Sequence, residues 1–412
     1  MRIRPWARWT LLVLLLSLAA GAAVAAHLRR DHLGKPFGMA LTFQPAGKPR
    51  GVVVVVAERV RSHGTAAQLA QSLADRGLLV ALVPARQVLT HVDPQHCALV
   101  ANDVERVGRR LMRQSGADAY FAPMLVGADA QGSALARLAV ANALPQTVAG
   151  AVLNGPASAA PAGCAVAPSS AEQGFVLERV GEQSVADMVV AHLPRPQPAF
   201  RGLPLIELPA VGSHRLAIFM SGDGGWRSLD KGVCNGLRAQ GVSVVGWDSL
   251  RYFWSRRTPD QTAADLAAVI DEYRQRWHAD EVELIGYSFG ADAMPFLYNR
   301  LPPATRASVR SISLLGLGHA ASFRVSVGDW LGTPSSDDVP VAPELAKLPP
   351  GELLCVYGED ERDTLCPTLA AQGIRVAKTR GGHHFDHNIP AMVERLRANF
   401  SRNDSAGQPP SG

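Results

Sequence analysis

Short apolar runs alternate with longer amphipathic stretches through the C-terminal part of the chain. Each apolar run is short enough to be a buried strand, and each amphipathic stretch is long enough to be a helix. Strands separated by helices form a parallel sheet with right-handed crossovers, so the pattern predicts an α/β domain with a mostly parallel sheet. The predicted strands are 215–220, 243–247, 281–287, 309–317 and 352–358, and the predicted helices lie around 229–240, 260–276, 289–300 and 389–401.

The N-terminal part repeats this pattern. Segment 51–85 parallels 215–249, and 123–140 parallels 282–299. Placing Gly127 on Gly286 puts Asp129 on Ser288 and Gln131 on Gly290. The repeat predicts two tandem α/β domains, of which the first is a degenerate copy that lacks the serine and is not catalytic.

The predicted domain boundaries follow the composition. A stretch with five prolines and no clear periodicity separates the halves and predicts a linker, and a polar stretch after Phe400 predicts a disordered tail. The expected organisation is a first domain over 35–191, a linker over 192–209, a second domain over 210–400 and a tail over 401–412.

Residues 1–26 have the layout of a secretory signal peptide. Arg2, Arg4 and Arg8 precede an apolar stretch, and small residues at 22–26 suit cleavage. The alternative is an uncleaved anchor, because the 18 residues from Trp9 to Ala26 are at the short limit for a membrane span. Either reading predicts export from the cytoplasm.

Charge and cysteine content narrow the function. The net charge of +5 includes the three leader arginines, which leaves about +2 (5 − 3) for the body, too little to argue for nucleic acid. Export permits disulfides. Cys355 and Cys366 flank one loop and are expected to pair, Cys97 and Cys164 lie in the first half, and Cys234 is left over, although it could replace one of the loop pair. The spacings match no zinc site, and neither metal nor cofactor is expected.

The motif Gly-Tyr-Ser-Phe-Gly at 286–290 follows the third apolar run of the second half. A G-x-S-x-G motif between a strand and a helix holds a serine on a sharp, strained turn with its hydroxyl exposed. Ser288 is therefore a candidate nucleophile. A serine needs a base and a carboxylate that orients the base, and on this type of sheet they follow in the order Ser, Asp or Glu, His.

The later loops supply both partners. Asp363 stands in a D-x-x-x-P turn after the last predicted strand and is the favoured acid, with Asp360 and Glu359 as rivals. His383 follows paired glycines and is the favoured base, with His384 as the close alternative; His387 fits a surface histidine.

An anion site near the serine would stabilise developing charge. The backbone N–H of Phe289 begins the helix after the serine, and the glycine-rich loop 221–226 after the first strand offers that of Asp223. These two groups are the predicted oxyanion donors. The loop lacks the Lys-Ser/Thr ending of a phosphate-binding P-loop.

Five segments together resemble the VirJ/AcvB family of exported α/β-hydrolase virulence proteins. They are SGDGGW (221–226), DSLRYFWSRRTP (248–259), GYSFGAD (286–292), YGEDERDTLCP (357–367) and GGHHFD (381–386). The resemblance to the two-half form runs from about 35 to 400. It implies a periplasmic serine esterase, acting on the aminoacyl ester of lysyl- or alanyl-phosphatidylglycerol in membrane lipid homeostasis, with Ser288, the acid near Asp363 and the His383/His384 pair in the ester-hydrolysing role.

Evidence from the residues for a lipid substrate rests on aromatic and basic side chains near the predicted site. Trp226, Tyr252, Trp254 and Arg257 are expected to contact substrate, since aromatic rings suit an interface and arginine suits a phosphate. The competing hypothesis is a non-catalytic binding or assembly factor that docks an exported protein through the first half.

Overall fold

The computed structural model describes residues 28–90, 92, 97–144, 147–168, 170, 173–194, 200–325 and 338–406. The chain divides into two compact units at Arg195/Pro196, within the predicted linker. The predicted signal peptide or anchor at 1–26 lies outside the described residues. Among the helices described, none is both long and apolar enough to cross a membrane.

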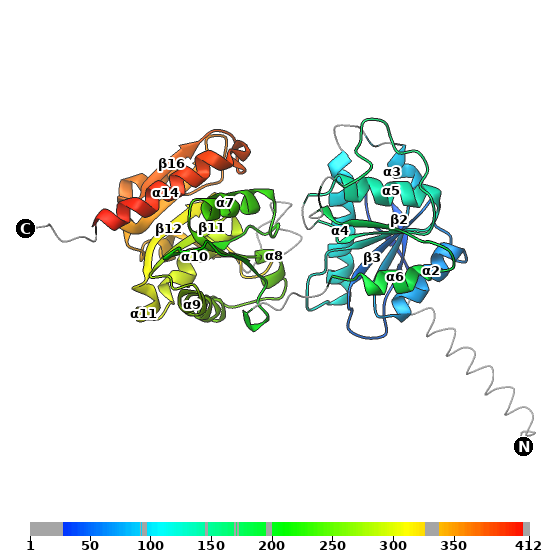
Figure 1. Cartoon of the computed structure of the whole chain (residues 1–412), viewed down its shortest axis with the longest axis horizontal. Coiled ribbons are helices and arrows are strands. Elements are labelled where there is room, and N and C mark those ends of the chain that lie inside the picture. Colours follow the sequence, from blue (N-terminus) through cyan, green and yellow to red (C-terminus); the bar gives the residue numbers. More distant parts are fainter. Residues whose placement is uncertain are drawn as a thin grey trace, which may run out of the picture. The chain divides into compact units, whose positions relative to one another are not determined.

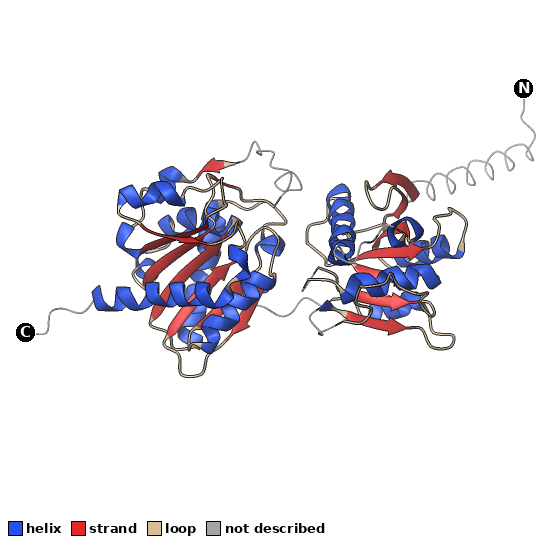
Figure 2. Cartoon of the chain, turned by 90° about the horizontal axis from the view of Figure 1, so that it is seen from above, coloured by secondary structure: helices blue, strands red, loops and turns tan. Residues whose placement is uncertain are grey.

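The second unit is a seven-stranded sheet with helices on both faces (Figures 1 and 2). The strand order is β16-β15-β12-β11-β9-β10-β8, and β8 alone among these neighbours runs antiparallel. The strands are β8 (Leu205–Leu208), β9 (Arg215–Met220), β10 (Ser243–Trp247), β11 (Glu281–Tyr287), β12 (Val309–Leu315), β15 (Leu353–Gly358) and β16 (Arg375–Thr379), with a small separate pair β13 (Ala320–Ala321) and β14 (Val339–Pro340).

Helices α7 and α14 pack on one another, as do α9 and α10. The side chains of Ala217 and Phe219 on β9 point into the core beneath α7 and α14, which explains the apolar run in this strand. The helices are α7 (Ser228–Ala239), α8 (Ser249–Tyr252), α9 (Pro259–Arg276), α10 (Phe289–Asn299), α11 (Pro303–Arg306), α12 (Ala342–Leu345), α13 (Cys366–Leu369) and α14 (Ile389–Ala406), with 3₁₀ turns η3 (Phe200–Gly202), η5 (Pro350–Glu352), η6 (Ala370–Gln372) and η7 (Phe385–His387).

Two predicted boundaries are wrong. The proposed linker contains β8, which pairs antiparallel with β10 at the sheet edge and buries Leu205. The proposed tail begins inside α14, which continues to Ala406. The prolines of this segment argued against a strand, so β8 was missed. An edge strand makes ladder hydrogen bonds along one side only, and it therefore tolerates nearby prolines.

The first unit is also a seven-stranded sheet, in the order β1-β2-β4-β3-β5-β6-β7. It begins at Leu28, earlier than the predicted start at 35. Its elements are β1 (Leu28–His32), β2 (Met39–Phe43), β3 (Val52–Ala57), α2 (Thr65–Asp75), β4 (Leu79–Pro84), α3 (Arg86–Leu89), α4 (Cys97–Ser115), β5 (Met124–Gly127), α5 (Ala130–Ala141), β6 (Gly150–Leu153), β7 (Phe175–Glu178) and α6 (Val185–Ala191).

Strand order and register match between the units. The order β2-β4-β3-β5-β6-β7 corresponds to β8-β10-β9-β11-β12-β15, and in both the first strand is the antiparallel one. Val56 pairs with Gly127 in the first sheet, and Met220 pairs with Gly286 in the second. The two pairs are those that the repeat equates, so the fold supports an internal duplication.

Two disulfides tie loops to this framework. Cys355 on β15 bonds to Cys366 at the start of α13, as predicted, and Cys97 bonds to Cys164 in the first unit. Cys234 is a buried free thiol. The Cys355–Cys366 bond closes the loop that follows β15, so it restrains the segment in which the catalytic acid was expected.

Candidate active site

Ser288 lies on the sharp turn between the central strand β11 and helix α10. Its backbone adopts φ 53° and ψ −119°, a strained conformation for a residue with a Cβ. A Cβ on Gly286 would clash with the carbonyl of Gly290, and one on Gly290 would clash with the carbonyl of Met220. Both flanking glycines are therefore required by close backbone packing, and the turn has the geometry that the G-x-S-x-G motif predicts.

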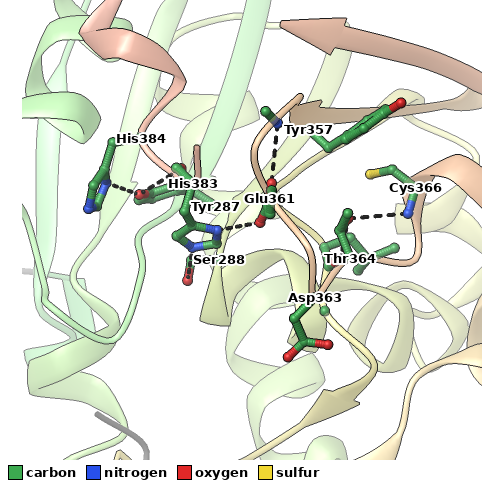
Figure 3. Close-up of polar contacts among 12 residues, drawn as sticks. Tyr287, Ser288, Tyr357, Glu361, Asp363, Thr364, Cys366, His383 and His384 are labelled. Atoms are coloured by element: carbon green, nitrogen blue, oxygen red, sulfur yellow. Dashed lines mark hydrogen bonds and ion pairs between the residues drawn. The ribbon is translucent and has the colours of Figure 1, made fainter. Parts of the chain in front are cut away.

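His383 reaches Ser288 from the loop after β16. Its Nε2 lies 2.8 Å from the serine Oγ, within hydrogen-bond distance (Figure 3). A Cβ on Gly316, which follows β12, would lie 2.7 Å from Cε1 of the imidazole, so only glycine leaves room for the ring in this position. The structure thus brings together the predicted nucleophile and the favoured base.

Glu361, rather than any of the predicted acids, contacts the other ring nitrogen. Its Oε1 lies 2.5 Å from Nδ1 of His383, and its Oε2 accepts a hydrogen bond from the backbone N–H of Gly358 at 3.2 Å. The Glu361 side chain is only 6% exposed. A buried carboxylate held by a backbone donor is well placed to fix the orientation and tautomer of the imidazole.

The prediction that Asp363 orients His383 is wrong in this geometry. The Asp363 side chain is 92% exposed and points away from the imidazole (Figure 3). Its Oδ1 lies 3.4 Å from Nε2 of His319. Asp360 and Glu359 are also exposed, and their backbone N–H groups bond to the 379–381 segment. The loop after β15 turns so that position 361 faces inward and positions 359, 360 and 363 face solvent.

The alternative base, His384, makes a different contact. Its Nδ1 lies 2.7 Å from the hydroxyl of Tyr287, and its ring stacks on that of His387. The Tyr287 hydroxyl also donates to the backbone carbonyl of His383 at 3.4 Å. Tyr287 therefore positions the histidine loop, a role that the sequence reasoning missed although the residue precedes the serine within the motif.

Burial and neighbouring charges shift the pKa values of three titratable groups at the site. Burial lowers the pKa of His383, but the hydrogen bond and negative charge of Glu361 raise it, and the net direction is upward from the ordinary 6.5. Burial raises the pKa of Asp292 to about 8, although its carboxylate accepts from the backbone N–H of Gly318. Burial also lowers the pKa of His384, with the charges of the neighbouring histidines acting in the same direction.

The predicted oxyanion donors lie beside the serine. Phe289 begins α10, so its N–H has no acceptor within the helix. Across from it, Gly222 lies against the nucleophile, since a Cβ there would be 3.4 Å from the Cβ of Ser288. The loop that carries Asp223 thus passes directly by the hydroxyl. Within the described residues, no hydrogen bond engages the N–H of Phe289 or Asp223.

Three of the four side chains predicted to contact substrate are buried and are not free to do so. Trp226, Tyr252 and Trp254 are 2–3% exposed and belong to the protein core. Trp226 covers Gly246 and meets Phe219 edge to face. Arg257 stacks its guanidinium 4.7 Å from the centre of the Tyr252 ring. Aromatic content alone could not reveal that these rings face inward, so this prediction is wrong for the three aromatic residues.

The equivalent turn in the first unit has a different construction. Asp129 has an extended backbone and caps α5 by accepting the N–H of Gly132 at 2.8 Å. Its other oxygen accepts the N–H of Glu58 at 2.8 Å, and the register makes Glu58 the counterpart of Gly222 in the second unit. The carboxylate therefore occupies backbone donors of the kind that would bind an oxyanion.

The repeat alignment needs one correction at this turn. A Cβ on Gly132 would clash with the carbonyl of Val56, as one on Gly290 would with that of Met220. Gly132, not Gln131, is therefore the counterpart of Gly290, and the first unit carries one extra residue in the turn. The longer turn relaxes the strained backbone that a nucleophilic serine needs.

No group of three or more His, Cys, Asp or Glu side chains within the described ranges could hold a metal ion.

Residues 214–403 match the family described as bacterial virulence protein (VirJ). No curated protein sequence matches the chain. Est1E from Butyrivibrio proteoclasticus with bound ferulic acid is 13% identical, with a TM-score of 0.35, covering 50% of this chain and 97% of that one. XC6422 from Xanthomonas campestris, an α/β serine hydrolase without a lid, is 17% identical, with a TM-score of 0.32, covering 48% of this chain and 87% of that one.

The geometry of the serine turn and the match over 214–403 bear on the second unit alone. The first unit shares the strand order and lacks the serine. The C-terminal unit is thus the part of this chain that is similar to the VirJ family of bacterial virulence proteins.

Proposed function

We propose that Ser288, His383 and Glu361 form the catalytic triad of a serine carboxylic-ester hydrolase. The observation that carries this proposal is the continuous chain of contacts from Ser288 Oγ to His383 Nε2 at 2.8 Å and from His383 Nδ1 to Glu361 Oε1 at 2.5 Å. The strained turn that exposes the serine is the second support. The triad is Ser-His-Glu, in place of the expected Ser-His-Asp.

The reaction follows from the positions of these atoms. His383 Nε2 takes the proton of Ser288 as Oγ attacks the ester carbonyl, while Glu361 stabilises the imidazolium through Nδ1–H. The N–H of Phe289, with a donor from the 222–223 loop, stabilises the tetrahedral oxyanion. The imidazolium then protonates the departing alcohol, and water, deprotonated by His383, hydrolyses the acyl-enzyme.

The substrate we propose is the aminoacyl ester of lysyl- or alanyl-phosphatidylglycerol. The alcohol released would then be phosphatidylglycerol, and the acid released from the enzyme would be the free amino acid. This choice rests on the resemblance of the five sequence segments to the VirJ/AcvB family, whereas the buried side chains of Trp226, Tyr252 and Trp254 do not support it. We place the reaction in the periplasm, which the two disulfides support because such bonds persist in oxidising compartments.

The substrate is tested with purified protein and vesicles that contain lysyl- or alanyl-phosphatidylglycerol. We expect free amino acid to appear together with an equal amount of phosphatidylglycerol, measured by chromatography and lipid mass spectrometry. A simple activated ester is assayed in parallel. Hydrolysis of that ester with intact aminoacyl lipid would reject the lipid substrate and retain the esterase.

The competing binding-factor hypothesis is separated by a fluorophosphonate probe, which reacts with activated serines. We expect labelling of Ser288 in the folded full-length protein. Folded protein that stays unlabelled would favour a binding or assembly role for an exported partner. The position of Asp129 on the backbone donors of the first unit supports a single reactive serine, in the second unit.

The pH dependence of hydrolysis should reflect the raised pKa of His383. The imidazole must be neutral to accept the serine proton, and Glu361 stabilises its charged form, so activity is lost as pH falls through a pKa above 6.5. We therefore expect the midpoint of the acid limb of kcat/KM above 6.5, measured with an activated ester across neutral pH. A midpoint at or below that of free histidine would contradict the coupling between the two residues.

A further inference from the structure

An open cavity of about 720 Å³ lies at the carboxyl ends of β3 and β4 in the first unit. The β1–β2 hairpin, the segment after β3 and the start of α3 line it. Ligands of open α/β sheets bind at the carboxyl ends of the strands, so the cavity occupies the edge at which such folds place their sites. The proposed hydrolase activity of the second unit makes no use of this cavity.

The cavity is lined by more positive than negative side chains. Arg30, Arg59 and Arg86 contribute three positive charges, and Glu58 contributes the negative charge among its described lining residues, which leaves +2 (3 − 1) with His32 neutral. Guanidinium groups bind phosphate oxygens through paired N–H donors. The charge balance therefore favours an anion.

Two of the arginines lie near the same carboxylate oxygen of Glu58. Arg59 Nε lies 3.7 Å and Arg86 Nη1 3.9 Å from the same Oε1 of Glu58. Both separations are longer than a hydrogen bond, and the guanidinium-bearing side chains are 59% and 58% exposed. Neither arginine is thus held tightly by Glu58, and solvent or a ligand can reach both.

Apolar side chains form the remaining lining. Phe37 and Leu41 are buried at the base of the hairpin, and Met39 is 54% exposed. An exposed methionine beside arginines suits a ligand that carries apolar groups next to its anion. A phosphate ester meets this description better than a bare metal or a cation.

In the first unit, the position equivalent to that of Ser288 is not available to the anion. There the carboxylate of Asp129 already accepts the N–H groups of Glu58 and Gly132, and its negative charge would repel a second anion. Glu58 also lines the cavity, so the cavity adjoins that occupied position. The first unit has thus lost the catalytic anion site and retains an accessible basic one beside it.

We infer that this cavity binds a phosphate-bearing anion through Arg59 and Arg86, with Arg30 at its rim. The phosphate is that of a lipid headgroup or of a small soluble ester. Binding draws the two guanidinium groups from Glu58 onto the phosphate oxygens. Neither the binding nor its test depends on Ser288.

The test compares two double variants of the full-length protein with equal loss of charge. Arg59→Gln/Arg86→Gln removes the cavity pair. Arg76→Gln/Arg137→Gln removes two first-unit arginines that pair with Asp187 and Glu178 and do not line the cavity. Binding of inorganic phosphate is measured by calorimetry, and binding to phosphatidylcholine vesicles with and without phosphatidylglycerol is measured by co-sedimentation. Thermal unfolding confirms that each variant is folded.

We expect the cavity variant to weaken binding by about tenfold or more, since it loses charge-assisted hydrogen bonds to the phosphate, and the control variant to bind as the parent does. Phosphatidylglycerol-dependent sedimentation identifies a lipid headgroup. Phosphate binding without sedimentation identifies a soluble ester. Absence of both, or equal losses in the two variants, would overturn the inference. Phosphate binding by a protein that hydrolyses no ester would reject the proposed function alone.

Discussion

Ser288→Ala should reduce ester hydrolysis by the purified protein by roughly 10⁴-fold or more, because the serine forms the covalent intermediate and no neighbouring group can replace it. The alanine side chain fits the same turn, since it lacks only the hydroxyl that contacts His383 Nε2. We therefore expect the variant to fold and to lose activity. Hydrolysis of an activated ester and fluorophosphonate labelling provide two independent measurements, and both should be lost.

The matched control lies in the first unit of the same chain. Asp129→Asn changes the residue that occupies the serine's place while keeping an oxygen to accept from Gly132. We expect this variant to hydrolyse the ester at the parental rate, because the first unit lacks a nucleophile. Activity in Ser288→Ala equal to that of the parent would reject Ser288 as the nucleophile. A loss of activity in Asp129→Asn alone would mean that the reaction takes place in the first unit.

Buried parallel strands were the most predictable part of the fold. The ranges predicted for β9, β10 and β11 coincide with those observed, because central strands are apolar on both faces and end at polar or glycine-rich turns. Edge strands were less predictable. β8 is short and flanked by Pro204 and Pro209, and β16 carries only two apolar residues, so neither stood out from a loop.

Site residues could be predicted from the sequence where the contacts that position them lie close together along the chain. The serine turn is encoded within five residues, since two glycines are required where the backbone of α10 passes β9 and β11. His383 was identifiable from the paired glycines of its loop. Its choice over His384 is explained by the structure, in which Tyr287 holds His384 away from the serine.

The acid could not be chosen from sequence because four acidic residues share one loop. Which of them faces His383 depends on the path of the chain after β15, where Gly358 donates to Glu361 and the Cys355–Cys366 bond closes the loop. One signal was available. Glu361 lies three residues beyond Gly358, the end of the strand, and its longer side chain can fold back to that strand end, whereas Asp363 lies five residues beyond.

Glu361→Gln should lower kcat/KM by about 10³- to 10⁴-fold, the range typical when the carboxylate of a serine triad becomes an amide. The amide keeps the size of the side chain but removes the negative charge that stabilises the imidazolium and can present an N–H to Nδ1 of His383. The pKa of His383 should fall with the loss of that charge, so the residual activity should have an acid limb at lower pH than the parent. Steady-state kinetics across neutral pH measure both effects.

Asp363→Asn is the paired control from the same loop, with the same change of charge. Its side chain is 92% exposed and faces His319, so we expect kcat/KM within about twofold of the parent and an unchanged acid limb, as is usual for an exposed ion pair. The reverse result, with a large loss in Asp363→Asn and little in Glu361→Gln, would mean that the loop after β15 rearranges to bring Asp363 onto the histidine during catalysis. The comparison therefore decides between the residue that the D-x-x-x-P turn favours and the one that contacts the imidazole.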